Sequence, residues 1–255
     1  MTVALQILFA LFIIILLILF VFRPKRKPLF ELPANYPDLL ADYVPFYAAL
    51  DEDSKKRFED RFARFHAAVR ITGANAEVED LDRVLIGAAA IIPVFYIPDW
   101  DYVNLREVLL YPGRFNLDFE QGGPDRTVSG MVGNQHLEGV LLLSKWEMRQ
   151  GFINPHSNRN VAVHEFVHLV DKMDGTLDGV PQILLERKYM DRWKALLEAT
   201  ANSIRNGESD IDAYGATSPV ECFAVVSEYY FNQPELFKER HPELAEGLGR
   251  IYRSR

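Results

Sequence analysis

The chain contains the stretch Val161-Ala-Val-His-Glu-Phe-Val-His-Leu-Val170. It is apolar apart from His164, Glu165 and His168, and it lacks Gly and Pro, so it predicts a mostly buried helix. On a helix, the two histidines lie one turn apart on the same face, where both imidazoles can reach one metal ion. Glu165 is turned toward the open side, where it can accept a proton from a water at the metal. A buried helix that carries two histidines by chance is the less favoured interpretation.

Length and composition exclude several other classes of protein. A chain of 255 residues with 12% aromatic and 25% charged residues fits a single folded domain with a proper core. The one cysteine, Cys222, excludes an intrachain disulfide and a Cys-rich zinc module, so His and carboxylate remain as metal ligands. The net charge of −8 argues against nucleic acid as the main partner.

The N-terminal segment has a separate pattern. Residues 3–22 carry no charge, and twenty helical residues at about 1.5 Å each span a bilayer core of about 30 Å. A basic run follows directly, whereas a cleaved signal peptide would need a basic n-region and a small-residue cleavage site. We therefore expect residues 1–28 to be a transmembrane anchor with its basic flank. The protein would then be single-pass in the inner membrane, with its catalytic domain in the cytoplasm.

The rest of the chain divides into a short connector and one domain. Residues 29–50 are rich in proline and predict a stalk or an extended wrap, and residues 51–255 are expected to form the domain. Pro112–Gly139 has no clear periodicity and predicts a long loop, which in compact domains is often a lid or a binding loop. Periodicity predicts helices over 51–70, 81–92, 159–173, 186–206, 219–232 and 241–252, with short strands over 106–111 and 139–144. The expected fold class is α+β: a mostly helical domain with a small β-sheet, preceded by one transmembrane helix.

Two histidines leave a catalytic zinc site incomplete, because such a site takes three protein ligands and one water. Glu221 is the acid that stands out, at the start of an otherwise apolar helix after Ser218-Pro-Val. The same residues fit a capping box, with Ser218 at the N-cap and Glu221 at N3. Spacing alone leaves both interpretations of Glu221 open. Glu228, two turns along the same face, is the other candidate ligand, or a partner that hydrogen-bonds a ligand.

Two longer strings carry a family resemblance. Residues 164–175 read HEFVHLVDKMDG, and residues 212–231 read DAYGATSPVECFAVVSEYYF. Both resemble the Mlc titration factor A family of zinc-dependent peptidases, and the likeness covers roughly residues 50–252. The resemblance implies a zincin-like fold, similar to the catalytic domain of anthrax lethal factor. It also implies hydrolysis of a peptide or protein substrate.

The resemblance further implies a ligand set and an additional site residue. In the family, the two motif histidines and the Glu of the Pro-x-Glu helix bind zinc, which implies one Zn²⁺ per chain on His164, His168 and Glu221. In the similar fold a tyrosine seven residues before the ligand Glu faces the zinc, and Tyr214 occupies that position. The sequence alone also allows Tyr214 to be a loop tyrosine that covers the core.

These residues predict a mechanism. Glu165 would take a proton from water and pass it to the leaving amine, while Tyr214 would donate a hydrogen bond to the oxyanion. Asp171 lies on the histidine face of the helix and is expected to orient a ligand ring through its free N–H. Its alternative, an acid in the last helical turn, is disfavoured by the helix dipole. The strand at 139–144 is expected to be the edge along which an extended peptide lies.

Two other classes of function stay open. The chain can be a regulator that binds a transcriptional repressor or another protein, because the family name records such a role. It can also be a scaffold stabilised by metal, without turnover. Glu165 argues against the scaffold, because a structural zinc needs no general base and a closed site has four ligands. The sequence does not separate peptidase from regulator.

Overall fold

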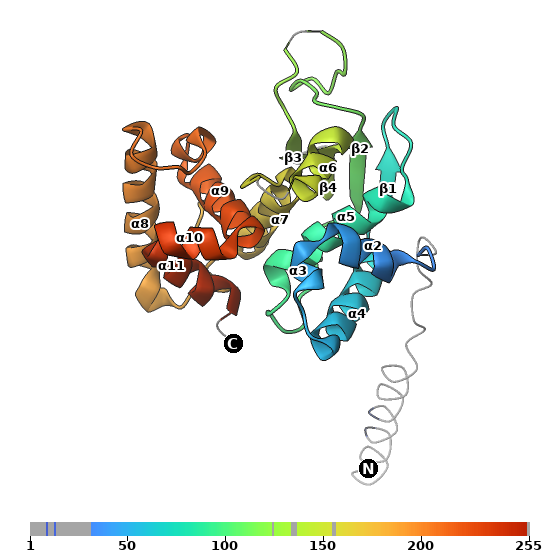
Figure 1. Cartoon of the computed structure of the whole chain (residues 1–255), viewed down its shortest axis with the longest axis horizontal. Coiled ribbons are helices and arrows are strands. Elements are labelled where there is room, and N and C mark those ends of the chain that lie inside the picture. Colours follow the sequence, from blue (N-terminus) through green and yellow to red (C-terminus); the bar gives the residue numbers. More distant parts are fainter. Residues whose placement is uncertain are drawn as a thin grey trace.

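A computed structural model describes Phe9, Ile13 and residues 32–123, 125–133, 137–154 and 157–253. Helix α7 (Val161–Asp171) runs through the middle of the molecule, between two groups of elements (Figure 1). One group holds the sheet and the helices α2 (Tyr36–Tyr43), α3 (Pro45–Ala48), α4 (Glu52–Ala68) and α5 (Asp80–Ile91). The other group holds α8 (Arg187–Arg205), α9 (Pro219–Asn232), α10 (Pro234–Arg240) and α11 (Pro242–Arg253). The helix with the HExxH string is therefore covered from both sides.

The sheet is small and mixed. Its strands are β1 (Arg70–Gly73), β2 (Glu107–Tyr111), β3 (Gly130–Val132) and β4 (Val140–Ser144), in the spatial order β1-β2-β4-β3. β1, β2 and β4 are parallel, whereas β3 pairs with β4 in the antiparallel direction. β3 is thus an edge strand, and α6 (Lys145–Ile153) follows β4 directly.

Successive side chains of β4 are buried on opposite faces of the sheet. Leu141 and Leu143 belong to the main core, whereas Leu142 packs with Tyr111 and Phe115 in a second cluster on the other face. Phe115 also forms an isolated antiparallel bridge with Val128. The connection between β2 and β3 therefore covers one face of the sheet.

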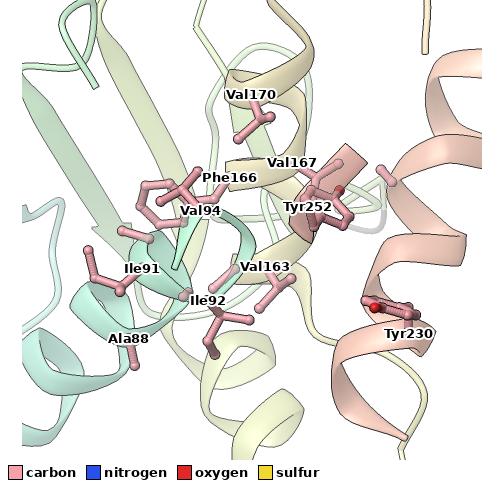
Figure 2. Close-up of a cluster of buried hydrophobic side chains, with 14 of the residues drawn as sticks. Ala88, Ile91, Ile92, Val94, Val163, Phe166, Val167, Val170, Tyr230 and Tyr252 are labelled. Atoms are coloured by element: carbon pink, nitrogen blue, oxygen red, sulfur yellow. The ribbon is translucent and has the colours of Figure 1, made fainter. Parts of the chain in front are cut away.

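The main core joins α7 to its neighbours. Figure 2 shows Val163, Phe166, Val167 and Val170 of α7 beside residues of α5 and of the 3₁₀ turn that follows it, η1 (Ile92–Val94). Tyr230 and Tyr252 approach from α9 and α11 in the same view. Burying each large apolar side chain contributes about 1.5–3 kcal/mol. This packing fixes the axis of α7 and with it the direction of the polar face.

Helix α7 has clear start and stop signals. The Asn160 side chain accepts a hydrogen bond from the backbone N–H of Val163 at 3.2 Å, which caps the N-terminus. After Asp171 the chain tightens into a 3₁₀ turn, η3 (Lys172–Asp174), and Gly175 ends it at φ +93°. Glycine takes this left-handed conformation without the steric cost of a Cβ atom, so it ends the helix readily.

The predicted helices and strands are largely confirmed. The predictions over 51–70, 81–92, 159–173, 186–206, 219–232 and 241–252 correspond to α4, α5, α7, α8, α9 and α11, and the two predicted strands are β2 and β4. Several elements were not predicted, among them the helices α2, α3, α6 and α10 and the strands β1 and β3. The mostly helical α+β class is therefore correct for the domain.

The predicted membrane anchor needs correction. Within the described residues, no helix combines the length and the apolar character needed to cross a bilayer. The longest of these helices, α8, has 19 residues and carries several charged side chains. A single-pass protein of the inner membrane is therefore not supported. Residues 3–22, on which the predicted anchor falls, lie outside the described residues apart from Phe9 and Ile13.

The proline-rich connector contains two short helices between residues 36 and 48. Within residues 29–50, α2 and α3 form, and both have proline at the start, where its missing N–H is tolerated. Leu40, Val44 and Tyr47 are buried in the main core. The division into connector and domain at residue 50 stays a prediction.

Candidate metal centre

Three predicted ligand side chains converge between α7 and α9. Glu221 Oε2 lies 2.9 Å from His164 Nε2 and 3.4 Å from His168 Nε2. The three donor atoms all lie within 4.8 Å of one another, and both histidines are buried. Two imidazole nitrogens and one carboxylate oxygen in a mostly buried position form a donor set that suits Zn²⁺. The residues present therefore fit a metal ion of this kind.

Glu221 stands at the N3 position of α9, as the capping interpretation predicts, but its carboxylate does not complete a capping box. Its backbone N–H donates to Ser218 Oγ at 3.1 Å, so Ser218 caps α9 as the capping interpretation predicts. The carboxylate, however, points to the two histidines. Burial tends to raise the pKa of Glu221, but hydrogen bonds from His164 and His168 outweigh it and lower that pKa. The Glu221 carboxylate is therefore ionised beside the two imidazole rings.

Glu228 is hydrogen-bonded to His164 through the ring nitrogen that Glu221 does not contact. Its Oε1 lies 2.5 Å from His164 Nδ1, and its Oε2 accepts the backbone N–H of Asn160 at 2.6 Å. A hydrogen bond at Nδ1 leaves Nε2 directed toward Glu221 and available to a metal. Burial alone would lower the pKa of His164, but the charge of Glu228 and the hydrogen bonds to both glutamates raise it well above its ordinary value.

Asp171 is close in sequence to His168 but is not hydrogen-bonded to it. Its Oδ2 accepts the backbone N–H of Gly179 at 2.7 Å. Its Oδ1 and the Nδ1 of His168 are both buried and lack a hydrogen-bond partner within the described residues. Burial raises the pKa of Asp171 to about 6. One turn of α7 thus holds an unpaired acceptor and an unpaired ring nitrogen, and the role of Asp171 in orienting His168 stays a prediction.

Glu165 lies buried under the edge strand of the sheet. Burial raises the pKa of its carboxyl above the ordinary value, against the lowering effect of the two histidines. A Cβ atom placed on Gly130 of β3 would come within 2.7 Å of both Cγ and Oε1 of Glu165. Glycine at this position therefore leaves the space that the glutamate occupies.

This close approach predicts a specific effect of one methyl group. If Glu165 is the proton acceptor that the HExxH string predicts, Gly130→Ala should displace its carboxylate and lower kcat by about tenfold or more, because misplacing a reacting group by about 1 Å can cost a hundredfold. Metal content should stay at the wild-type level. Gly113→Ala is the matched control, because a Cβ there meets nothing within 4 Å. Wild-type kcat in Gly130→Ala would contradict the steric argument.

Tyr214 stands beside the histidines on a short 3₁₀ turn, η4 (Ala213–Ala216). Its ring centroid lies 6.0 Å from that of His164, and the side chain is 51% exposed. Burial and the negative charges of Glu221 and Glu165 raise its pKa to about 12. The phenol is therefore protonated at neutral pH and can donate a hydrogen bond.

These side chains share one cleft of about 700 Å³. Its walls come from β3 and the segment before it, α6, α7, η4 and α9. It is lined by six of the seven candidate residues, His164, Glu165, His168, Tyr214, Glu221 and Glu228, and Asp171 is the exception. The prediction that the strand at 139–144 is the open edge was wrong: β4 is paired on both sides, and β3 is the edge strand on the cleft.

Two features of the site were not found from the sequence. β3 has three residues within a segment rich in Gly and polar residues, and it is held by pairing with β4. Arg159 and Asp212 form an ion pair at the cleft across 53 positions of the chain. Neither feature has a local pattern, so only the tertiary structure brings these residues to the site.

One protein family and several known proteins match most of this chain. The family described as glucose-regulated metallo-peptidase M90 matches residues 23–253. Mlc titration factor A of Enterobacter sp. (strain 638) is 33% identical over 228 residues, covering 82% of both chains. Mlc titration factor A of Klebsiella pneumoniae subsp. pneumoniae is 32% identical over 227 residues, covering 82% of this chain and 83% of the relative. An uncharacterised protein of Synechocystis is 28% identical over 242 residues.

The family match spans most of the chain, including both strings that resembled zinc-dependent peptidases. The HExxH helix, the third donor on α9 and the shared cleft all lie within the matched residues. This chain belongs to the glucose-regulated metallo-peptidase M90 family.

Proposed function

We propose that the chain is a zinc-dependent peptidase that hydrolyses peptide bonds with Glu165 as general base. The observation that carries the proposal is the convergence of His164, His168 and Glu221 in the cleft that also holds Glu165. A three-donor set leaves a position for water, as catalytic zinc sites do. A metal-stabilised scaffold would need neither the open cleft nor the buried acid.

Each side chain has a part in the proposed chemistry. His164, His168 and Glu221 would hold the zinc ion, which would supply Lewis acidity for the scissile carbonyl and for the attacking water. Glu165 takes the proton from the attacking water and passes it to the leaving amine. Burial raises the pKa of the Glu165 carboxyl, which favours the protonated form that donates to the amine. The Tyr214 hydroxyl donates a hydrogen bond to the carbonyl oxygen as negative charge develops there.

The shape of the cleft favours an extended peptide as substrate. β3 borders the cleft as an edge strand, and such strands hold extended peptides through backbone hydrogen bonds. Glu228 holds His164 at Nδ1, which keeps the ring in one orientation throughout.

Metal removal tests the proposal directly. The purified full-length chain should contain one zinc ion and should cleave members of a mixed peptide library, as read by mass spectrometry. Treatment with a chelator should abolish cleavage, and added Zn²⁺ should restore it. Cleavage that survives complete removal of the metal would contradict the proposal.

Relatives supply a second candidate function. Several similar proteins are named Mlc titration factor A, a name that points to an interaction with Mlc. By analogy, this chain can bind a transcriptional regulator, with peptidase activity secondary. Comparing wild type with Glu165→Gln in both a peptide-cleavage assay and a pull-down with purified Mlc separates the two functions. Lost cleavage with intact binding would show that both exist and are independent.

Tyr214→Phe tests the proposed oxyanion contact. Losing one such donor costs about 3 kcal/mol, so kcat should fall roughly a hundredfold with little change in KM or zinc content. The hydroxyl matters mainly in the transition state, which is why the loss should fall on kcat. A tyrosine that only packs would leave kcat unchanged and lower Tm slightly, and steady-state kinetics with a thermal melt distinguishes the two.

A further inference from the structure

An ion pair connects the turn of Tyr214 to the start of the metal-binding helix. Arg159 Nε donates to Asp212 Oδ2 at 2.5 Å, and Arg159 Nη2 contacts the same oxygen. Arg159 directly precedes Asn160, the N-cap residue of α7, whereas Asp212 directly precedes η4. Both side chains line the cleft. The pair therefore bridges the two segments that bring His164 and Tyr214 together.

The same carboxylate also holds the backbone of Tyr214. Asp212 Oδ1 accepts the backbone N–H of Tyr214 at 2.9 Å, and the carbonyl of Asp212 accepts the N–H of Gly215 at 3.0 Å. On the far side of the residue, Thr217 Oγ1 donates to the Tyr214 carbonyl at 2.7 Å. The Asp212 carboxylate thus accepts from Arg159 with one oxygen and from the backbone N–H of Tyr214 with the other.

The rest of η4 is held by other elements. Gly215 is buried, and a Cβ there would lie 3.3 Å from Ile204 of α8 and 3.5 Å from Val225 of α9. These contacts fix the turn against α8 and α9 but not against α7, which carries the two histidines. The Tyr214 side chain is half exposed, so packing constrains its direction only in part.

We infer that the Arg159–Asp212 ion pair positions Tyr214 over the metal centre by tying its turn to the start of α7. Arg159 is 63% exposed, and exposed ion pairs add little to global stability. Its effect is therefore local: it restricts the turn and directs the phenol toward the position of the oxyanion. The catalytic part of this inference rests on the proposed function of Tyr214, whereas the restraint on the turn does not.

Hydrogen–deuterium exchange on the metal-free, full-length chain tests the restraint without any activity. Arg159→Gln should remove protection from peptides that cover residues 212–217, with no change in Tm. Asp212→Asn should act in the same direction, because it keeps an acceptor for the Tyr214 N–H and weakens only the ion pair. The matched control is Arg114→Gln, which breaks a similar pair with Glu147 at 2.5 Å on the same cleft but does not touch η4. It should leave exchange at 212–217 unchanged.

A double-mutant cycle tests the positioning. Arg159→Gln should lower kcat by about tenfold with little change in KM, and Arg159→Lys, which keeps the charge, should restore part of that loss. The double variant Arg159→Gln/Tyr214→Phe should be no slower than Tyr214→Phe alone, because Arg159 acts through the phenol. For Arg114→Gln, by contrast, the effect on kcat should multiply with that of Tyr214→Phe, because the two side chains act independently.

The outcomes separate the restraint from the catalysis. Unchanged exchange in Arg159→Gln would overturn the inference, and so would a double variant slower by the full product of the single effects. A raised KM with unchanged kcat would also overturn it, by showing that Arg159 binds an anionic group of the substrate. Faster exchange together with wild-type kcat in Tyr214→Phe would support the restraint and refute the proposed function of Tyr214.

Discussion

Glu165→Gln should reduce peptide hydrolysis by about 10²- to 10⁴-fold, which is the typical contribution of general acid–base catalysis. The amide has nearly the shape of the carboxylate, so it can fill the space beneath Gly130, but it cannot accept the proton from water. Glu165 is not one of the three converging donors, so zinc content should stay at one ion per chain. The loss should appear in kcat and in kcat/KM alike.

The measurement needs metal analysis beside kinetics. Steady-state cleavage of one library-derived peptide should be compared with zinc content in the same preparation. Glu246→Gln on α11 is a matched control: it is an exposed glutamate paired with Arg250, outside the cleft. It should have wild-type kcat. A Glu165→Gln protein that retains both zinc and turnover would show that another group is the base.

The predictability of this site depends on how local each signal is. Helix α7 could be predicted because a stretch without Gly and Pro surrounds the two histidines. Glu221 could be found but not assigned, because an N3 glutamate after Ser218 fits a cap equally well. The structure shows why both interpretations had support: the backbone N–H is capped, while the carboxylate reaches the histidines.

Other parts of the site depend on pairing across long stretches of sequence. Edge strand β3 forms because it pairs with β4, and its three residues carry no alternation of their own. A Cβ atom on Gly130 would meet Glu165, which lies 35 positions later in the sequence, so no local pattern shows that glycine is needed there. The segment 3–22 shows the opposite error, because a strong local apolar pattern led to an anchor that no described helix supports.

The second large effect is expected at Glu221, with Glu228 as its comparison. Glu221→Ala removes one of the three converging ligand atoms, whereas Glu228→Ala leaves all three in place and removes the hydrogen-bond partner of His164 and of the Asn160 N–H. Losing such a partner typically costs about 10–100-fold in metal affinity, so Glu221→Ala should cost more than that. Competition with a chromophoric zinc chelator measures both affinities. Undiminished affinity in Glu221→Ala would assign the third ligand to Glu228 instead.

The metal-free chain should show the opposite order in stability. Glu228 is deeply buried and satisfies two groups, His164 Nδ1 and the Asn160 N–H, so its removal leaves both without a partner inside the protein. An unsatisfied buried polar group costs about 1–3 kcal/mol. The Glu221 side chain is 21% accessible to solvent. After Glu221→Ala, water can therefore reach the histidine nitrogens and replace some of the lost hydrogen bonds. Thermal melts in chelator should therefore place Glu228→Ala below Glu221→Ala, whereas zinc affinity ranks them the other way. If the same variant were the weaker one in both melting temperature and zinc affinity, one of the two carboxylates would have been assigned the wrong role.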